Sequence, residues 1–337
     1  MAVKALILGC AGTTLTDDER AFFKEVQPWG LILFKRNIAD HAQVKGLVED
    51  FRERVGRDDA PVLIDQEGGR VQRLGPPVWP AYPSASSFAR IGDPLLRRSA
   101  IRLGARLIAH DLRALGITVN CLPVLDVPVA GADAVISDRA YGTKPEEVAI
   151  GGRAAAEGLL AGGVLPVIKH MPGHGRATAD SHMALPHVAA ARDVLAAHDF
   201  APFRALADMP LAMTAHIVFT AIDERHPATL SRRVFKEVIR GEIGFEGLVM
   251  TDDLSMKALS GSFAERTRRA YAAGCDVVLH CNGVGDEMEA VARAAKPLAG
   301  KAKQRAAAAL ARNRHSPEPF DSVDERARFD GLLAGKG

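Results

Sequence analysis

The sequence lacks the features that mark several large classes of protein. No apolar run reaches the roughly 20 residues that a membrane-spanning helix needs, and residues 1–9 have neither a basic region nor a long apolar region, as a secretory signal would. The formal net charge is only +2 over 337 residues, which gives no indication of a basic surface for nucleic acid or anionic lipid. We therefore expect a cytoplasmic protein that binds neither nucleic acid nor membranes.

Cysteine is also scarce, and its spacing excludes two kinds of site. The four cysteines contain no pair separated by two residues, and four in a chain of this length do not make a disulfide framework (Cys10, Cys121, Cys275 and Cys281). We expect them to be reduced and buried, where cysteine behaves as a small apolar side chain.

What the sequence does contain is a repeated alternation of short apolar, β-branched runs with helical patterns. The runs that we interpret as buried strands lie at residues 5–8, 30–34, 61–65, 118–122, 163–168, 211–216, 247–252 and 276–280. The helical patterns lie at residues 17–26, 42–55, 94–115, 145–160, 231–243 and 263–273. Alternation of this kind indicates a parallel sheet with helical crossovers, and eight strands close a (β/α)8 TIM barrel.

The alternative fold is an open, doubly wound sheet. That fold would place a Gly-x-Gly-x-x-Gly turn after an early strand, and residues 9–12 lack this spacing. Hydrophobic residues make up 47% of the chain, which is enough for one large core. We assign residues 1–300 to the barrel, and residues 301–337 to a C-terminal helical extension that packs on its outside. Pro317 and Pro319 separate the two helical patterns of the extension.

The richest polar segment follows the fifth predicted strand. It reads Lys-His-Met-Pro-Gly-His-Gly at residues 169–175, and Asp180, Ser181 and His182 follow closely. Everything after residue 168 is too polar and too rich in glycine and proline to continue the strand, so we expect a loop. A buried strand that delivers titratable groups onto a loop is typical of a catalytic or binding site. The alternative is a surface loop whose histidines only form hydrogen bonds.

Polar side chains also follow the other predicted strands. In a barrel the carboxyl ends of the strands share one face, where active sites lie. We expect a pocket for a polar ligand there, formed by Asp65, Asp126, Lys169, His170, His216, Asp252 and His280. Asp253 has a simpler interpretation, as the cap of a helix that begins near Leu254. Asp252 is thus the better candidate for a rigidly held carboxylate.

A metal site is the main alternative for the loop. His170 and His174 are four residues apart, as in a helical zinc motif, but the intervening Met-Pro-Gly is incompatible with a regular helix. Asp180 and His182 could still be ligands. We expect no metal, and a metal-dependent hydrolase would be distinguished by loss of activity with a chelator.

Asp180 and His182 are two residues apart, so in an extended segment their side chains would point the same way. The carboxylate could then accept the imidazole N–H, fix its tautomer and favour its protonated form. Together with Asp252, such a pair suits acid-plus-nucleophile chemistry at an acetal.

Three segments together resemble the signatures of the β-N-acetylhexosaminidases of glycoside hydrolase family 3, in the single-domain form of Gram-negative bacteria. These segments are residues 169–182, residues 65–73 (Asp-Gln-Glu-Gly-Gly-Arg-Val-Gln-Arg) and residues 251–256 (Thr-Asp-Asp-Leu-Ser-Met). The family often has Phe where this chain has Met171, and Ser where it has Thr251. Neither departure removes a proposed catalytic group.

The resemblance implies a retaining exo-glycosidase that needs no cofactor and removes a terminal β-linked N-acetylglucosamine. By motif position, Asp252 is the nucleophile, His182 the acid/base and Asp180 its partner. The residues implied to hold the sugar are Asp65, Arg73, Arg139, Lys169 and His170, with Arg139 in a further family segment at residues 135–142.

The implied substrate is N-acetylglucosamine joined to 1,6-anhydro-N-acetylmuramic acid, with or without its peptide, in peptidoglycan recycling by a monomeric enzyme. Two alternatives within the sugar-binding class stay open. A non-catalytic sugar-binding barrel would be favoured if Asp252 or His182 were replaced, and both are present. A β-glucosidase is opposed by the Asp180–His182 dyad, which the family's glucosidases generally lack. Phosphate could also replace water as the acceptor, because a histidine repels it less than a carboxylate does.

Overall fold

The computed structural model describes residues 2–181 and 183–335, and within them eight parallel strands close into a barrel. Around the barrel, the strands follow the order β1-β12-β11-β9-β7-β6-β3-β2. They are β1 (Lys4–Leu8), β2 (Pro28–Leu33), β3 (Val62–Ile64), β6 (Val119–Asn120), β7 (Leu165–Met171), β9 (Leu211–Thr214), β11 (Leu248–Asp253) and β12 (Val277–His280). Because β1 pairs with both β2 and β12, the sheet has no open edge, which confirms the TIM barrel and excludes the open sheet.

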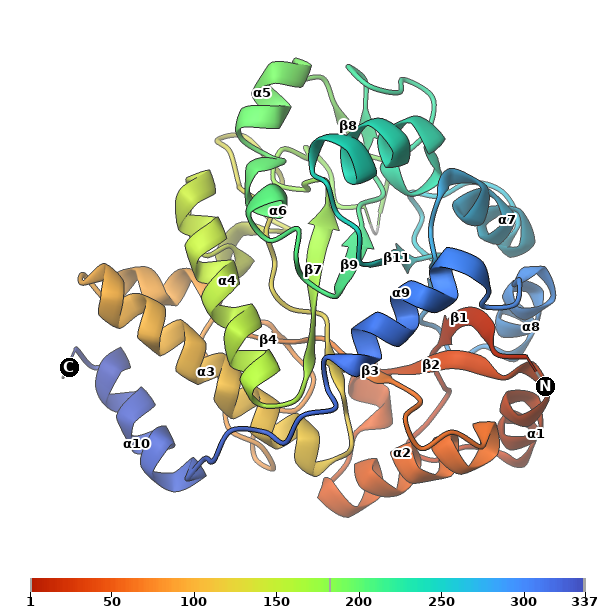
Figure 1. The fold of residues 1–337 in the computed structure, drawn as a ribbon, viewed down its shortest axis with the longest axis horizontal. Helices are drawn as coiled ribbons and strands as arrows, with labels where there is room; N and C mark the ends of the chain where they lie inside the picture. The colour runs from red at the N-terminus through yellow and green to blue at the C-terminus, as the bar shows by residue number, and fades with distance from the viewer. Residues whose placement is uncertain (1, 182, 336–337) are drawn as a thin grey trace.

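Helices cover the barrel on its outside (Figure 1). They are α1 (Asp17–Val26), α2 (His41–Val55), α3 (Pro94–Ala114), α4 (Pro145–Ala161), α5 (Arg192–Ala197), α6 (Ala201–Ala205), the π-helix η5 (Val234–Glu242), α7 (Phe263–Ala273), α8 (Gly285–Ala294), α9 (Gly300–Ala311) and α10 (Ser322–Leu333). Several begin at a side chain that accepts a hydrogen bond from the first turn, such as Thr16 in α1, Asp40 in α2 and Ser262 in α7.

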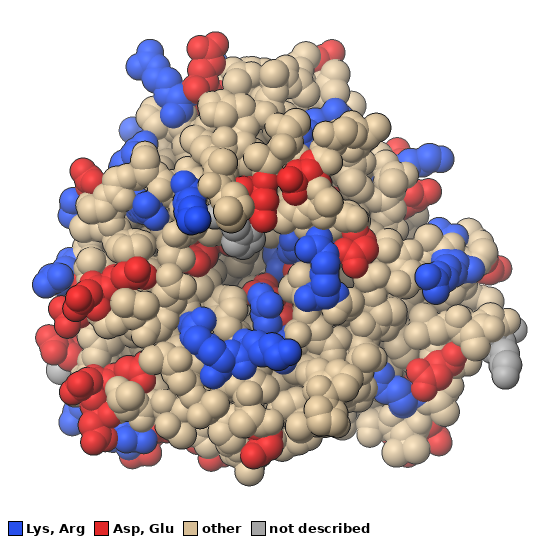
Figure 2. Space-filling model, turned by 180° about the vertical axis from the view of Figure 1, so that it is seen from behind, with Lys and Arg blue, Asp and Glu red and all other residues tan. Residues whose placement is uncertain are grey.

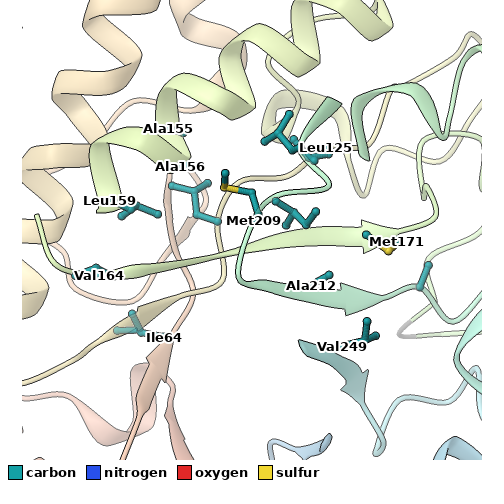
Figure 3. Packing of buried hydrophobic residues seen from close by; sticks show 14 of the residues in the cluster. Ile64, Leu125, Ala155, Ala156, Leu159, Val164, Met171, Met209, Ala212 and Val249 are labelled. Atoms are coloured by element: carbon teal, nitrogen blue, oxygen red, sulfur yellow. The ribbon is translucent and has the colours of Figure 1, made fainter. Parts of the chain in front are cut away.

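Alternation along each strand divides the core into two layers. In β1, Ala5 and Ile7 point into the barrel, whereas Leu6 and Leu8 face the helices. Figure 3 shows part of the outer layer, where Leu159 and Ala156 of α4 lie close to Val164, just before β7. The inner layer is filled by apolar side chains from all eight strands, so the barrel is a packed core rather than a channel.

Helix α9 lies across the amino-terminal end of the barrel. Its Ala306 and Ala309 belong to the same buried cluster as Ala5 and Leu165, which are near the starts of their strands. In Figure 1 this helix runs in front of the strands, so Figure 2, seen from behind, views the carboxyl-terminal end. The other C-terminal helix, α10, packs on α3, where Gly104 leaves room for the Phe329 ring.

Most of the predicted elements are confirmed, but one predicted helix is absent. No helix begins near Leu254, and after β11 the next described helix is α7. The helix predicted over residues 231–243 is confirmed, because helical backbone begins at Arg232 and continues through η5, and the Ser231 hydroxyl at its start accepts a hydrogen bond from the Val234 N–H at 3.1 Å. The described part of the chain contains no helix that combines the length and apolar character needed to span a bilayer.

The contact between α3 and α4 depends on a glycine, and this gives the first prediction. A Cβ on Gly158 of α4 would lie 2.2 Å from the Arg102 carbonyl oxygen of α3. We expect Gly158→Ala to lower the free energy of unfolding by about 1–3 kcal/mol, the usual cost of overpacking, in urea titrations. The control is Gly46→Ala in α2, where nothing lies within 4 Å of the new Cβ. It should raise stability by up to about 1 kcal/mol, and equal effects of the two variants would contradict this view of the contact.

Candidate active site

A pocket of about 320 Å3 lies at the carboxyl-terminal end of the barrel. Charged side chains of both signs gather around the hollow in Figure 2. The pocket is lined by Ile32, Phe34, Asp65, Arg70, Val71, Arg73, Val135, Arg139, Lys169, His170, Asp180, Met213, Asp252, Asp253, Leu279 and Cys281. All the described residues that the sequence assigned to catalysis or sugar binding are therefore in one pocket.

Lys169 is the centre of an ionic network in this pocket. Its side chain is only 2% exposed, and its Nζ lies 2.9 Å from Asp65 Oδ1 and 2.7 Å from Glu67 Oε1. Arg139 donates from Nε and Nη2 to the two oxygens of Glu67, at 2.8 Å each, in a bidentate pair. Arg73 Nη2 lies 3.2 Å from Asp65 Oδ2. The pocket floor thus alternates cations and carboxylates that hold one another in place.

The network keeps its members charged although they are buried. Burial alone would raise the pKa of Asp65 and Glu67, but the nearby cations, Lys169 first, outweigh it and hold both values below the ordinary range. Burial would likewise lower the pKa of Lys169, whereas the two carboxylates hold it above its ordinary value. Fixed charges of this kind are suited to hydrogen-bonding the hydroxyl groups of a sugar.

Asp126 organises a second network beside the first. Its Oδ2 lies 2.7 Å from His170 Nδ1, and its Oδ1 accepts the His174 N–H at 2.6 Å. Burial would raise the pKa of Asp126, but His170 and His174 hold it below its ordinary value. Burial, followed by the charge of His170, lowers the pKa of His174 to about 4, so this imidazole is neutral at pH 7. Its Nε2 lies 3.0 Å from Ser181 Oγ.

The strand that carries Lys169 and His170 is longer than the sequence predicts. We expected the strand to end at residue 168, but β7 continues to Met171. The backbone stays paired there, because Lys169 accepts the Leu125 N–H at 2.6 Å and Met171 accepts the Ala215 N–H at 2.8 Å. The polar side chains can remain in a buried strand because Asp65, Glu67 and Asp126 supply their partners.

Asp252 and Asp253 end β11 and differ in their surroundings. The prediction that Asp253 caps a helix beginning near Leu254 was wrong. Its Oδ1 accepts the N–H groups of Ser255 and Cys281 at 3.0 Å each, so it closes the turn after the strand. Asp252 Oδ1 accepts the Asp253 N–H at 2.8 Å, and the residue lines the pocket. Asp252 therefore presents a carboxylate to the pocket from the end of a strand.

The loop after β7 brings Asp180 to the pocket, and His182 lies outside the described residues. The backbone turns here, because the Asp180 carbonyl accepts the N–H groups of Met183 at 2.9 Å and Ala184 at 3.1 Å. The roles expected for Asp180 and His182 stay predictions.

Three of the strand-end residues expected in the pocket do not line it, namely the buried Asp126 and two histidines. His216 is buried between the Thr229 hydroxyl, 2.7 Å from Nδ1, and the Asp253 carbonyl, 3.0 Å from Nε2. His280 is also buried, with its ring edge-on to Phe263 at 5.1 Å. Desolvation lowers the pKa of both histidines, which suits a role in packing. The expectation that they help to form the pocket was wrong.

Sequence reasoning missed Glu67, which pairs with both Lys169 and Arg139. A signal was present, since Asp65 and Glu67 are two residues apart and can face one side of an extended segment. Among the residues that the structure describes, no three His, Cys, Asp or Glu side chains are arranged to hold a metal ion.

Comparisons with known proteins agree with this geometry. The model of the glycosyl hydrolase family 3 N-terminal domain matches residues 3–312. The chain is 40% identical over 288 residues to a β-hexosaminidase of Alkalilimnicola ehrlichii, covering 84% of this chain and 82% of the relative. It is 35% identical to a β-hexosaminidase of Thiobacillus denitrificans, covering 99% and 93%.

Solved structures give the same answer. The structure of NagZ from Neisseria gonorrhoeae with N-trifluoroacetyl-D-glucosamine superimposes with a TM-score of 0.85, at 30% identity, and covers 99% of this chain and 97% of that one. A family 3 β-N-acetylglucosaminidase from a Paenibacillus species gives 0.86 at 31% identity, over 98% of this chain and 67% of its own. The chain therefore belongs to glycosyl hydrolase family 3, and the relatives that it matches over most of its length are β-hexosaminidases of that family.

Proposed function

We propose that this protein is a retaining exo-β-N-acetylglucosaminidase that forms a covalent glycosyl-enzyme on Asp252, with His182 as acid/base. The observation that carries the proposal is the single pocket that holds Asp252, Asp180 and the Lys169 network together. Support also comes from the relatives named as β-hexosaminidases and from the Neisseria gonorrhoeae protein solved with an N-acylated glucosamine.

The sugar-binding part of the proposal rests on Asp65, Arg73, Arg139, Lys169 and His170. Carboxylate oxygens accept from sugar hydroxyls, and lysine and arginine N–H groups donate to them. These side chains are already held by ion pairs, among themselves or with Glu67 and Asp126. Binding a sugar would therefore cost little side-chain entropy, because the side chains are ordered beforehand. A pocket of about 320 Å3 suits one terminal sugar, hence exo-cleavage.

The chemistry divides between a carboxylate and an imidazole. Asp252 attacks C1 while His182 protonates the leaving oxygen, and the glycosidic C1–O bond breaks. His182 then takes a proton from water, which attacks C1 and releases Asp252 with the anomeric configuration retained. The ordinary pKa of histidine lies near neutrality, so one group can serve as acid and then as base. Asp180 is the proposed partner that orients the imidazole.

The proposed natural substrate is N-acetylglucosamine linked to 1,6-anhydro-N-acetylmuramic acid, alone or with its peptide, in peptidoglycan recycling. We place the enzyme in the cytoplasm as a monomer that acts without a metal or cofactor. This part rests on the resemblance of residues 65–73, 169–182 and 251–256 to the signatures of the family.

The first experiment measures hydrolysis of 4-nitrophenyl N-acetyl-β-glucosaminide and the matching β-glucoside, with and without a chelator. We expect cleavage of the acetamido sugar alone, insensitive to chelator. Asp252→Ala should lower kcat by about 10⁴-fold or more because the nucleophile is lost, and His182→Ala by about 10²–10⁴-fold. NMR of the first-formed sugar should show the β-anomer.

The control for this series is Asp193→Asn, which removes an exposed carboxylate outside the pocket and should leave both rates unchanged. An active Asp252→Ala enzyme, dependence on metal, or an α-anomer as first product would each refute the proposed mechanism.

The ionic network predicts a change in both activity and acid stability. In the wild type the pKa values of Asp65 and Glu67 are lower in the folded protein than their ordinary values of 3.8 and 4.5. Their ionised carboxylates therefore stabilise the fold at pH values above these ordinary values, and this stabilisation is lost progressively as the pH falls below them. Lys169→Met leaves the two carboxylates without their shared ammonium and should cost about 3–5 kcal/mol of unfolding free energy at pH 7. The loss of stability on acidification should then be smaller than in the wild type.

Urea titrations between pH 3 and 7 measure both effects, and kcat/KM should fall at least about tenfold in the same variant. Lys301→Met on the exposed side of α9 is the control. A Lys169→Met protein with wild-type stability at pH 7 would show that the ion pairs of Lys169 with Asp65 and Glu67 contribute nothing to the free energy of unfolding.

The contact between His174 and Ser181 predicts a positioning effect on the loop that bears Asp180. Ser181→Ala removes the hydroxyl 3.0 Å from His174 Nε2 and should lower kcat about tenfold, with little change in thermal unfolding. Thr178→Ala in the same loop removes an exposed hydroxyl and should keep full activity. If both variants lose activity equally, the His174 contact has no special role.

A further inference from the structure

The end of β11, which carries Asp252, extends beyond the part of the strand that pairs with β9. The register between these two strands ends with Met213 opposite Met250. Beyond that pair the connection is made by a side chain, because His216, two residues after β9, places its Nε2 3.0 Å from the Asp253 carbonyl oxygen. An imidazole thus continues the link between the two strands where the backbone pairing stops.

The peptide group between Asp253 and Leu254 is held from both neighbouring strands. Its carbonyl lies against His216 on the β9 side, and its N–H donates to the Leu279 carbonyl of β12 at 2.9 Å. The preceding N–H, that of Asp253, donates to Asp252 Oδ1 at 2.8 Å. The direction of the Asp252 carboxylate is therefore tied to a peptide group that His216 helps to fix.

The His216 ring is itself held in place. It is fully buried, and its Nδ1 lies 2.7 Å from Thr229 Oγ1, in the short 3-10 helix η4 (Ala228–Leu230). The same hydroxyl lies 2.8 Å from Thr214 Oγ1 and 3.0 Å from the Ala215 carbonyl oxygen. Contacts at both ring nitrogens therefore hold the imidazole in one orientation.

The proton of this ring can be placed from its partners. A carbonyl oxygen only accepts hydrogen bonds, so Nε2 must carry a proton to bind the Asp253 carbonyl. Burial lowers the pKa of His216, so the ring is neutral at pH 7 and has one N–H. His216 is not among the described residues that line the active-site pocket, so it would act on the reaction through the backbone that it holds.

We infer that His216 is a positioning residue, which aims the Asp252 carboxylate at C1 of the sugar by fixing the Asp253 carbonyl through Nε2–H. This inference rests on the proposed function, in which Asp252 is the nucleophile. A nucleophile displaced by about 1 Å reacts more slowly, whereas the groups proposed to bind the sugar stay in place. Loss of the His216 contact should therefore lower kcat far more than it changes KM.

The test compares two amides of different length at position 216, with kcat and KM measured on 4-nitrophenyl N-acetyl-β-glucosaminide. In His216→Gln the amide N–H can take the place of Nε2–H at the Asp253 carbonyl, and kcat should stay within about threefold of the wild type. In His216→Asn the shorter amide reaches only the place of Nδ1, beside Thr229. Its kcat should fall about 10- to 100-fold, with KM within about twofold of the wild type.

The control is His280→Asn, because His280 is also a fully buried histidine at the end of a strand. Its ring packs edge-on against Phe263 at 5.1 Å, and its nitrogens form no hydrogen bond to β11 within the described part of the chain. This variant should lose thermal stability, as His216→Asn should, and keep the wild-type kcat. The loss of a buried imidazole would by itself lower stability in both variants without a difference in kcat.

A measurement on the wild type decides the contact even where a variant fails to fold. 15N NMR distinguishes a protonated from a bare ring nitrogen, and His216, assigned through its backbone resonances, should have a protonated Nε2 at pH 7. A bare Nε2 overturns the inference, and so does a His216→Asn enzyme with wild-type kcat or an equal loss of kcat in the Gln and Asn variants. An active Asp252→Ala enzyme instead refutes the proposed nucleophile, so the two failures are distinct.

Discussion

The mouth of the barrel depends on the burial of the Lys169 ammonium between Asp65 and Glu67. Taking a charge out of water costs several kcal/mol unless partners of the opposite sign replace the solvent. Here the partners come from the end of β3 and from the β4–β5 hairpin, and Arg139 adds the segment after β6. Elements far apart in the sequence are thereby held at one place by charge rather than by apolar packing.

A neighbouring network performs the same task for the loop after β7. Asp126 holds the backbone and ring of His170 and the backbone of His174, and His174 contacts Ser181. Burial lowers the pKa of His174 to about 4, so the ring that contacts Ser181 is uncharged at pH 7. The loop that bears Asp180 is thus attached to a rigid strand through Asp126 and the neutral ring of His174.

The fold could be predicted from the sequence because its signals are local. Strand runs such as residues 5–8 and helix caps such as Thr16 are readable over a few residues. The errors concern features decided by distant partners. Lys169 continues β7 only because carboxylates about a hundred positions earlier neutralise it. Asp253 resembles a helix cap in sequence, but its carboxylate accepts a hydrogen bond from the N–H of Cys281, which directly follows β12.

The barrel interior beneath the pocket is filled by side chains such as Cys121, Val167 and Leu211, and α9 covers the far end. A ligand that enters from the mouth therefore leaves by the mouth, and the part bound deepest leaves last. For a substrate bound with its terminal sugar innermost, this fixes an order of events. The outer group departs first, water reaches the sugar through the space it vacates, and the sugar follows. The free sugar leaves an empty pocket, so at high concentration it should compete with the whole substrate for that pocket. The departed outer group leaves while the sugar is still bound, so it should instead occupy the space through which water reaches the sugar.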